Sequence, residues 1–194
     1  MFNDLASMLS LLETRRSGRP RDLVAPGPSP DELRRILAIA TRTPDHGKLA
    51  PWRFVHVAQD QRAAFAAVLD AAYRIDRPEP GRLELEANER FAHQAPELVV
   101  ALSCPTPDHK IPVWEQELSC GAACMNLLIA AHAMGYAAGW VTGWAAYSDV
   151  VRDAFGGSGE RIAGFIFIGT PGVELEERPR PEPGSVISKW VPPV

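Results

Sequence analysis

The stretch W-E-Q-E-L-S-C-G-A-A-C-M-N-L-L-I-A-A-H-A-M, from Trp114 to Met134, decides how the rest of this chain is arranged. It contains no proline and is rich in Ala, Leu and Met. Gly135 follows it, and glycine suits the left-handed conformation that ends many helices. We therefore predict one long helix of about 31 Å, which is long enough to span a domain.

Apolar or small residues occupy nearly every face of this predicted helix after Glu117. Such a helix is buried in its domain, spans a membrane or is covered by a second subunit. A membrane span is disfavoured because polar residues interrupt the run and no apolar segment of about 18 residues occurs. The alternatives left are a central helix inside one domain and a helix that faces a partner protomer. We favour the partner, because small side chains allow close approach at Ser119, Ala122, Ala123, Ala130 and Ala133.

The length, charge and cysteine content narrow the class of protein. A chain of 194 residues fits one domain with a sizeable core, and its net charge of −4 argues against a general nucleic-acid binder. The cysteines Cys104, Cys120 and Cys124 form no C-x-x-C pair, and without a signal peptide they indicate a reducing cytoplasm. The spacing of Cys120 and Cys124 could hold a metal, but no second ligand pair accompanies it, so we interpret them as core residues.

Hydrophobic periodicity predicts alternating helices and strands along the chain. Ser29 is a strong helix start, because its side chain can cap the helix and Pro30 follows. Residues 23–28 are predicted to be a linker, and the chain from Thr170 onward a tail without a core of its own. The predicted helices cover residues 5–14, 29–40, 60–73, 82–93, 114–134 and 148–155. The predicted strands cover residues 53–58, 97–103, 137–143 and 161–169.

Two loops carry side chains suited to an anion. Arg15, Arg16, Ser17 and Arg19 follow the first predicted helix, and guanidinium groups with a hydroxyl match phosphate oxygens. An ordinary basic helix end is the alternative. A second loop, which contains Pro44 and Pro51, places Arg42, His46 and Lys48 within seven residues.

The common catalytic and nucleotide-binding signatures are missing. The sequence has no G-x-S-x-G elbow, no P-loop and no G-x-G-x-x-G fingerprint, and its five histidines are too scattered to indicate a metal site. A bound ligand therefore needs another scaffold.

Four motifs in chain order resemble those of the nitroreductase family, in particular its compact bacterial branch. The likeness covers nearly the whole chain, and P-D-H-x-x-x-x-P-W is far more specific than R-R-S. The motifs are R-R-S at 15–17, R-T-P-D-H-G-K-L-A-P-W-R-F at 42–54, W-E-Q-E-L-S at 114–119 and G-W-V-T-G at 139–143.

The resemblance implies an α+β, three-layer fold with a central mixed, mainly antiparallel sheet flanked by helices. Residues 1–194 would form a single nitroreductase-like domain, of which residues 171–194 would be a C-terminal extension wrapping the partner protomer. The family's proteins are homodimers that hold FMN at the subunit interface and use NAD(P)H. Neither nucleic acid nor membrane is an expected partner.

The resemblance also assigns residues to the flavin site. Arg15, Arg16 and Ser17 would hold the ribityl phosphate or the pyrimidine edge, while Arg42 and His46 would reach the flavin from the other protomer. Trp140, Val141, Thr142 and Gly143 would run beside the ring system. Lys189 stands where larger relatives place a basic pair near the C-terminus. No protein residue is expected to be catalytic, because the flavin carries the chemistry.

The leading hypothesis from the sequence is thus an FMN-dependent NAD(P)H oxidoreductase that reduces nitroaromatic, quinone or similar electron-poor acceptors by alternating half-reactions. A flavin-binding or storage protein and a flavin-modifying enzyme on the same fold are the alternatives, followed by a bare anion-binding module.

Overall fold

The computed structural model describes residues 1–193 and is organised around one antiparallel sheet. β5 is its central strand and pairs with β3, β4 and, through its last two residues, β1, while β2 pairs with β3 at the edge. We expected a mixed sheet, but every pairing within residues 1–193 is antiparallel. The strands are β1 (Leu23–Val24), β2 (Trp52–Val57), β3 (Glu97–Ser103), β4 (Ala137–Val141) and β5 (Arg161–Pro171).

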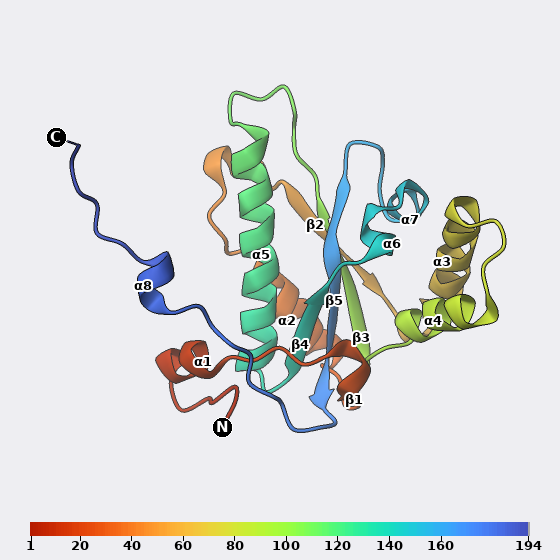
Figure 1. The fold of residues 1–194 in the computed structure, drawn as a ribbon, viewed down its shortest axis with the longest axis horizontal. Helices are drawn as coiled ribbons and strands as arrows, with labels where there is room; N and C mark the ends of the chain where they lie inside the picture. Colours follow the sequence, from red (N-terminus) through yellow and green to blue (C-terminus); the bar gives the residue numbers. More distant parts are fainter. Residues whose placement is uncertain (194) are drawn as a thin grey trace.

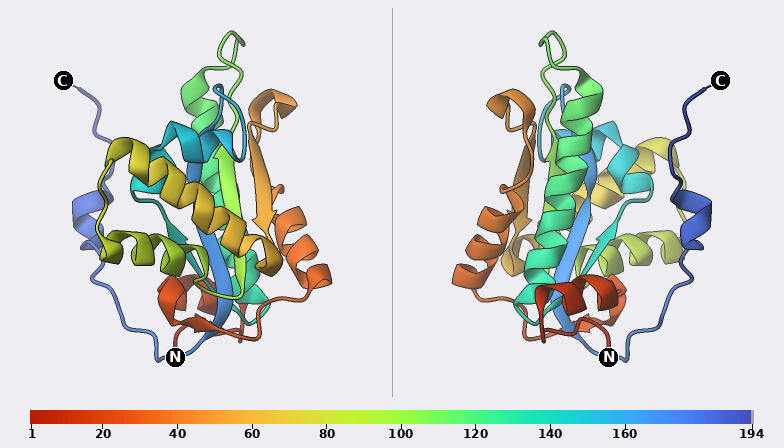
Figure 2. Two further views of the ribbon diagram at one scale, coloured as in Figure 1. Left: turned by 90° about the vertical axis from the view of Figure 1, so that its right-hand side faces the viewer. Right: turned by 90° about the vertical axis from the view of Figure 1, so that its left-hand side faces the viewer.

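Helices cover both faces of the sheet and form a three-layer α+β architecture (Figures 1 and 2). α2 and α5 lie on one face; α3, α4, α6 and α7 lie on the other. The helices of the described chain are α1 (Met8–Thr14), α2 (Pro30–Ala40), α3 (Arg62–Asp76), α4 (Arg82–Ala92), α5 (Val113–Ala133), α6 (Trp144–Tyr147), α7 (Asp149–Asp153) and α8 (Pro183–Val186).

The alternation of side chains along β3 explains the two layers. Val99 and Ala101 point toward α2 and α5, whereas Leu98, Val100 and Leu102 point toward α3 and α4. All of them are almost completely buried. A strand that is apolar on both faces requires helices on both faces, which is what the uninterrupted run E-L-V-V-A-L-S indicates.

The predicted central helix is α5, and most of its surface is buried within the protomer. Ser119, Ala123 and Ala130, which we expected to face a partner, pack instead inside this protomer. An open stripe runs along the other side of α5, where Trp114 and Leu118 are 67% and 53% exposed. The sequence pattern did not reveal which face lies open, because apolar residues surround the helix.

Arg62 is a buried cation that joins several chain segments on the α3 side of the sheet. Its side chain has no solvent exposure and donates to the carbonyl oxygens of Val57 at 2.9 Å, Ala92 at 2.8 Å, Gln94 at 3.3 Å and Pro96 at 3.2 Å. It therefore ties the end of β2 and the end of α4 to the start of β3.

Two short elements differ from the sequence prediction. Leu23 and Val24, predicted as part of a linker, form β1 by pairing with Pro171 and Thr170. Trp144–Tyr147, which received no prediction, forms α6 after Gly143. Both depend on contacts with distant parts of the chain, so local periodicity gives no signal for them.

The C-terminal tail leaves the body and carries α8 away from it (Figures 1 and 2). Its apolar side chains Val186, Ile187, Trp190 and Val191 are 66–76% exposed. No helix in residues 1–193 is long and apolar enough to cross a membrane.

Candidate functional site

The basic loop, residues Arg15–Arg19, is fixed in place by the N-terminus of the chain. The side chain of Asn3 accepts a hydrogen bond from the Arg16 amide at 2.8 Å and donates one to the Arg16 carbonyl at 3.2 Å. Within the loop, the guanidinium of Arg15 donates to the Ser17 hydroxyl at 3.2 Å. Asn3 thus holds the backbone in one conformation, a role that sequence reasoning missed.

The loop then crosses directly over β4. A Cβ atom added to Gly139 would lie 2.5 Å from the carbonyl oxygen of Gly18 and 3.2 Å from the Pro20 ring. Only glycine permits this approach, which explains why a glycine stands within the strand. The crossing brings the basic loop onto the strand that carries Trp140 and Val141.

Arg15 lies among other cations. Its pKa is lowered, first by partial burial and then by the positive charges of Arg180 and Arg16. Arg180 belongs to the tail, and sequence reasoning missed it because the tail has no periodic pattern. Lys189, the tail residue expected at this site, is exposed and has no hydrogen bond or ion pair within residues 1–193. Within one protomer, the cation of the tail that lies near Arg15 is therefore Arg180.

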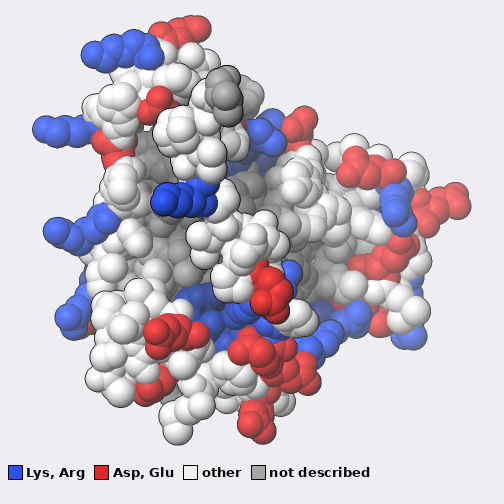
Figure 3. All heavy atoms as spheres, turned by 60° about the vertical axis from the view of Figure 1, so that its left-hand side comes forward, with Lys and Arg blue, Asp and Glu red and all other residues white. Residues whose placement is uncertain are grey.

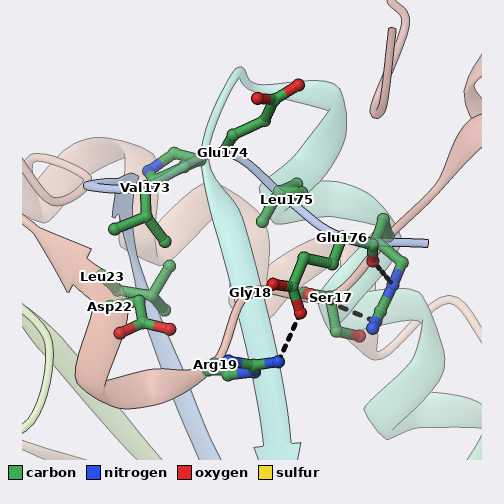
Figure 4. Close-up of a pocket in the computed structure, with 11 residues that line it drawn as sticks. Ser17, Gly18, Arg19, Asp22, Leu23, Val173, Glu174, Leu175 and Glu176 are labelled. Atoms are coloured by element: carbon green, nitrogen blue, oxygen red, sulfur yellow. Dashed lines mark hydrogen bonds and ion pairs between the residues drawn. The ribbon is translucent and has the colours of Figure 1, made fainter. Parts of the chain in front are cut away.

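An acidic segment of the tail faces the basic loop. The carboxylate of Glu176 lies 2.6 Å from Arg19, and its carbonyl oxygen accepts a hydrogen bond from Arg16 at 2.6 Å (Figure 4). The loop and residues 171–176 enclose a small cavity of about 40 Å³. On the face shown in Figure 3, Lys and Arg side chains gather beside a group of Asp and Glu side chains.

Trp140 and Val141 form the far end of β4. The indole of Trp140 donates to the Ala163 carbonyl at 3.0 Å and occupies space that a side chain at Gly164 would fill. Val141 packs partly against the core between β4 and α3. Gly164 thus accommodates Trp140 at the edge of the sheet.

Thr142 and Gly143 follow β4 and line a cavity of about 260 Å³. Phe91 and Asn88 of α4 line the same cavity. Asn88 is 4% exposed and donates to Asp70 at 2.9 Å. Sequence reasoning missed Asn88 because α4 is rich in charged residues and gives no local signal for a buried amide.

His132, near the end of α5, lies close to Arg15 and Arg16. It is fully buried, and its Nε2 accepts a hydrogen bond from the Ala138 amide at 3.4 Å. Burial first, and the charge of Arg15 second, lower the pKa of His132 to about 4. A neutral imidazole therefore lies beside the arginine cluster at neutral pH.

The second predicted loop runs along α5 from Asn126 to Glu115. Asn126 donates to the Arg42 carbonyl at 3.2 Å, and the His46 ring lies 2.8 Å from the Glu115 carboxylate. At 1.5 Å per residue, Glu115 and His132 are about 25 Å apart along the helix. The loop starts at Arg42, beside Asn126, and reaches the opposite end of α5 only at His46, so one protomer does not bring His46 to the basic loop.

The basic loop meets β4 at Gly139, and the four residues of the G-W-V-T-G motif that we assigned to the site follow from there along the strand. The described residues contain no cluster of three or more His, Cys, Asp or Glu side chains arranged to hold a metal ion. The arrangement can therefore hold an elongated anion, with its charge at the basic loop.

Solved structures share this architecture. The nitroreductase-like family protein from Bacillus cereus has a TM-score of 0.78 at 19% identity, covering 95% of this chain and 96% of that one. The FMN and NADPH-dependent nitroreductase NfnB from sphigopyxis sp. strain HMH has a TM-score of 0.73 at 19% identity, covering 95% and 99%. These likenesses define the fold as nitroreductase-like.

Sequence comparison then assigns the chain to its family. The sequence model of the family described as "Nitroreductase family" matches residues 12–170 of this chain. The chain is 38% identical over 173 residues to a putative NAD(P)H nitroreductase of Haemophilus influenzae, covering 88% of this chain and 91% of the relative. It is 35% identical over 164 residues to the putative NAD(P)H nitroreductase YdjA of Escherichia coli K12, covering 84% and 87%. The protein belongs to the nitroreductase family.

Proposed function

We propose that this protein is an FMN-dependent oxidoreductase that accepts hydride from NADH or NADPH and reduces nitroaromatic, quinone or similar acceptors in alternating half-reactions. One observation carries the proposal: β4 runs from an arginine-rich loop, at Gly139, to a cavity lined by Thr142 and Gly143. A surface that is basic at one end and has a cavity at the other suits a cofactor with a charged end and a broad apolar end. The names of the relatives, NAD(P)H nitroreductases, support the same reading.

The basic loop fits a phosphate group. Arg15 and Arg16 are half-buried; burial first, and the charges of Arg180 and Arg16 second, lower the pKa of Arg15, and a bound dianion would offset both. Ser17 offers a hydroxyl between them. We assign these three residues, with Arg19 and Arg180 beside them, to the ribityl phosphate of FMN.

The far end of β4 fits the ring system. Trp140, Val141, Thr142 and Gly143 would border it, and the apolar Val141 would offer only backbone groups and packing. Asn88 adds a buried amide at the same cavity. When bound, FMN supplies hydride acceptance and electron transfer; the residues of this chain bind it, orient it and exclude water.

A homodimer would complete the site. The loop that begins at Arg42 ends with His46 at the opposite end of α5 from the basic loop, so it would reach the flavin of the other protomer if two copies of α5 packed in opposite directions. The exposed stripe at Trp114 and Leu118 supplies an apolar surface for that packing. His46 would touch the flavin or its phosphate without acting as an essential proton donor.

The tail would extend the dimer contact. Its apolar residues Val186, Ile187, Trp190 and Val191 are mostly exposed in their own protomer, while the edge strand β2 carries an apolar groove lined by Leu37, Trp52 and Phe54. We assign the segment from about residue 171 onward to wrapping the partner. Lys189 would then approach the partner's flavin site rather than its own.

The purified protein tests the cofactor assignment. We expect a yellow protein with flavin absorbance that releases FMN on denaturation. Anaerobic mixing with NADH and NADPH in a stopped-flow instrument should bleach the flavin band, and addition of a nitroaromatic or a quinone should restore it.

Each alternative function predicts a different outcome of this experiment. A colourless protein that does not bind added FMN would contradict the cofactor assignment. Bound flavin that neither nicotinamide reduces would identify a flavin-binding or storage protein. Flavin that is reduced but converted to another compound would identify a flavin-modifying enzyme.

A further inference from the structure

Glu176 is the last residue that ties the tail to the body of the protomer. Gly172 donates its amide to the Asp22 carbonyl at 2.8 Å, and Glu176 then binds Arg16 and Arg19. Beyond Glu176, the hydrogen bonds and ion pairs of the described chain are local to the tail itself, such as Arg180 with Glu177.

The groups that hold Glu176 are the ones assigned to the phosphate. Arg19 reaches its carboxylate and Arg16 its carbonyl oxygen, both at 2.6 Å, and Ser17 lines the same cavity (Figure 4). A carboxylate carries one negative charge, whereas a phosphomonoester carries nearly two at neutral pH and offers three acceptor oxygens. A phosphate at this loop would therefore compete with Glu176 for the same donors.

The ion pair between Arg19 and Glu176 is weak enough for a phosphate to replace the carboxylate. Arg19 is 58% exposed and Glu176 is 73% exposed, and ion pairs in water contribute little because solvent screens them. A doubly charged group that engages Arg15, Arg16 and Ser17 together would gain more than this single contact loses.

We propose that Glu176 is an internal carboxylate competitor that makes the cofactor site selective for phosphomonoesters and couples cofactor binding to release of the tail. This inference rests on the proposed function. A ligand without a phosphate does not displace Glu176, so the tail stays tied to its own protomer. A phosphorylated ligand displaces it and frees the segment from Val173 onward. Because coupling is reciprocal, loss of the tie strengthens phosphate binding.

The matched variants are Glu176→Gln and Glu174→Gln. Both remove one negative charge from the same segment, but Glu174 has no ion pair within residues 1–193 and its carboxylate points away from Arg19 (Figure 4). FMN and riboflavin are titrated into flavin-free parent and variant proteins, with flavin fluorescence as the readout. We expect Glu176→Gln to lower the dissociation constant of FMN by about two- to fivefold and to leave that of riboflavin unchanged. Glu174→Gln should change neither. An equal effect in both variants, or no effect of Glu176→Gln on FMN, would overturn the proposal.

Limited proteolysis at Leu175, the half-buried residue of the segment 173–177, gives a second readout. In the parent, FMN or inorganic phosphate should speed thermolysin cleavage at Leu175; in Glu176→Gln, cleavage should already be faster without ligand. Unchanged cleavage in the parent at saturating ligand would contradict the inference. If the parent binds no FMN, the proposed function fails, and the phosphate titration with proteolysis still decides the role of Glu176.

Discussion

Arg15 lies where the basic loop, the end of α5 and the tail meet. Replacing it with alanine should remove a charge-assisted hydrogen bond to the cofactor phosphate, worth about 1.5–3 kcal/mol. We expect Arg15→Ala to raise the FMN dissociation constant by roughly tenfold to a hundredfold, measured by fluorescence titration. Arg21→Ala is the control, because that side chain is 69% exposed and its nearest acidic partner is Asp22. Similar losses in both variants would indicate a general charge effect and refute the assignment.

His132 predicts a pH dependence of stability. Its pKa is lowered to about 4 in the folded protein, whereas the unfolded chain binds its proton below about pH 6.5. The unfolded state thus binds more protons between these values, so the free energy of unfolding should fall as pH drops from about 6.5 to 4, by up to about 3 kcal/mol. Denaturant unfolding at several pH values measures this.

The variant His132→Gln isolates the contribution of this imidazole. Glutamine keeps an acceptor near Nε2 for the Ala138 amide but does not titrate. We expect its stability to depend less on pH in the same window. Identical pH slopes for variant and parent would show that other groups cause the effect.

At the scale of elements, Arg62 fixes how the ends of β2, α4 and β3 meet. Arg62→Met fills a similar space but removes the side-chain donor of the Val57, Ala92 and Gln94 carbonyl oxygens, while the Pro96 carbonyl keeps Gln59. Each buried unsatisfied group costs about 1–3 kcal/mol, so the free energy of unfolding should fall by at least about 3 kcal/mol. Arg77→Met, at an exposed ion pair, should change it by less than about 0.5 kcal/mol. Denaturant titrations compare the two, and equal stabilities would show that Arg62 is not needed.

The sequence predicted the elements whose signals are local. The capping box between Ser29 and Glu32 begins α2 where the pattern indicated, and the apolar run at Glu97–Ser103 is β3 with the expected bounds. The pattern missed β1, because two residues become a strand only by pairing with residues 170–171. The sequence pattern also did not predict which face of α5 is exposed, because burial depends on the elements that pack against the helix.

The residues of the candidate site likewise include some that the sequence could predict and some that it could not. Arg15, Ser17 and Gly143 stand in short motifs, so sequence reasoning could select them. Asn88 and Arg180 come from a charged helix and an aperiodic tail, where nothing local separates a residue that lines a site from one in solvent. Their proximity to the motifs exists only after the chain has folded.

At the scale of the whole molecule, the exposed stripe of α5 predicts assembly. We expect a dimer in sedimentation velocity experiments, with more than about 2,000 Å² buried in total. Leu118→Arg places a charge in that stripe and should produce a monomer that loses FMN. Leu83→Arg is the control, because Leu83 is 68% exposed on α4, on the opposite face of the sheet. A flavin-loaded monomer of the parent protein, or a stable dimer of Leu118→Arg, would contradict this arrangement.

The central position of β5 has a consequence for biosynthesis. β1, β3 and β4 all pair with β5, which is the last strand of the sheet to be synthesised; only β2 and β3 can pair before it appears. The basic loop is also anchored through Asp22 to Gly172, just past β5. A ribosome-bound chain that ends before residue 161 can therefore form only the β2–β3 pair of the sheet, and the proposed cofactor site is not yet closed. Flavin capture has to await release of nearly the whole chain, and prematurely terminated products expose the apolar strand β3 to chaperones and proteases.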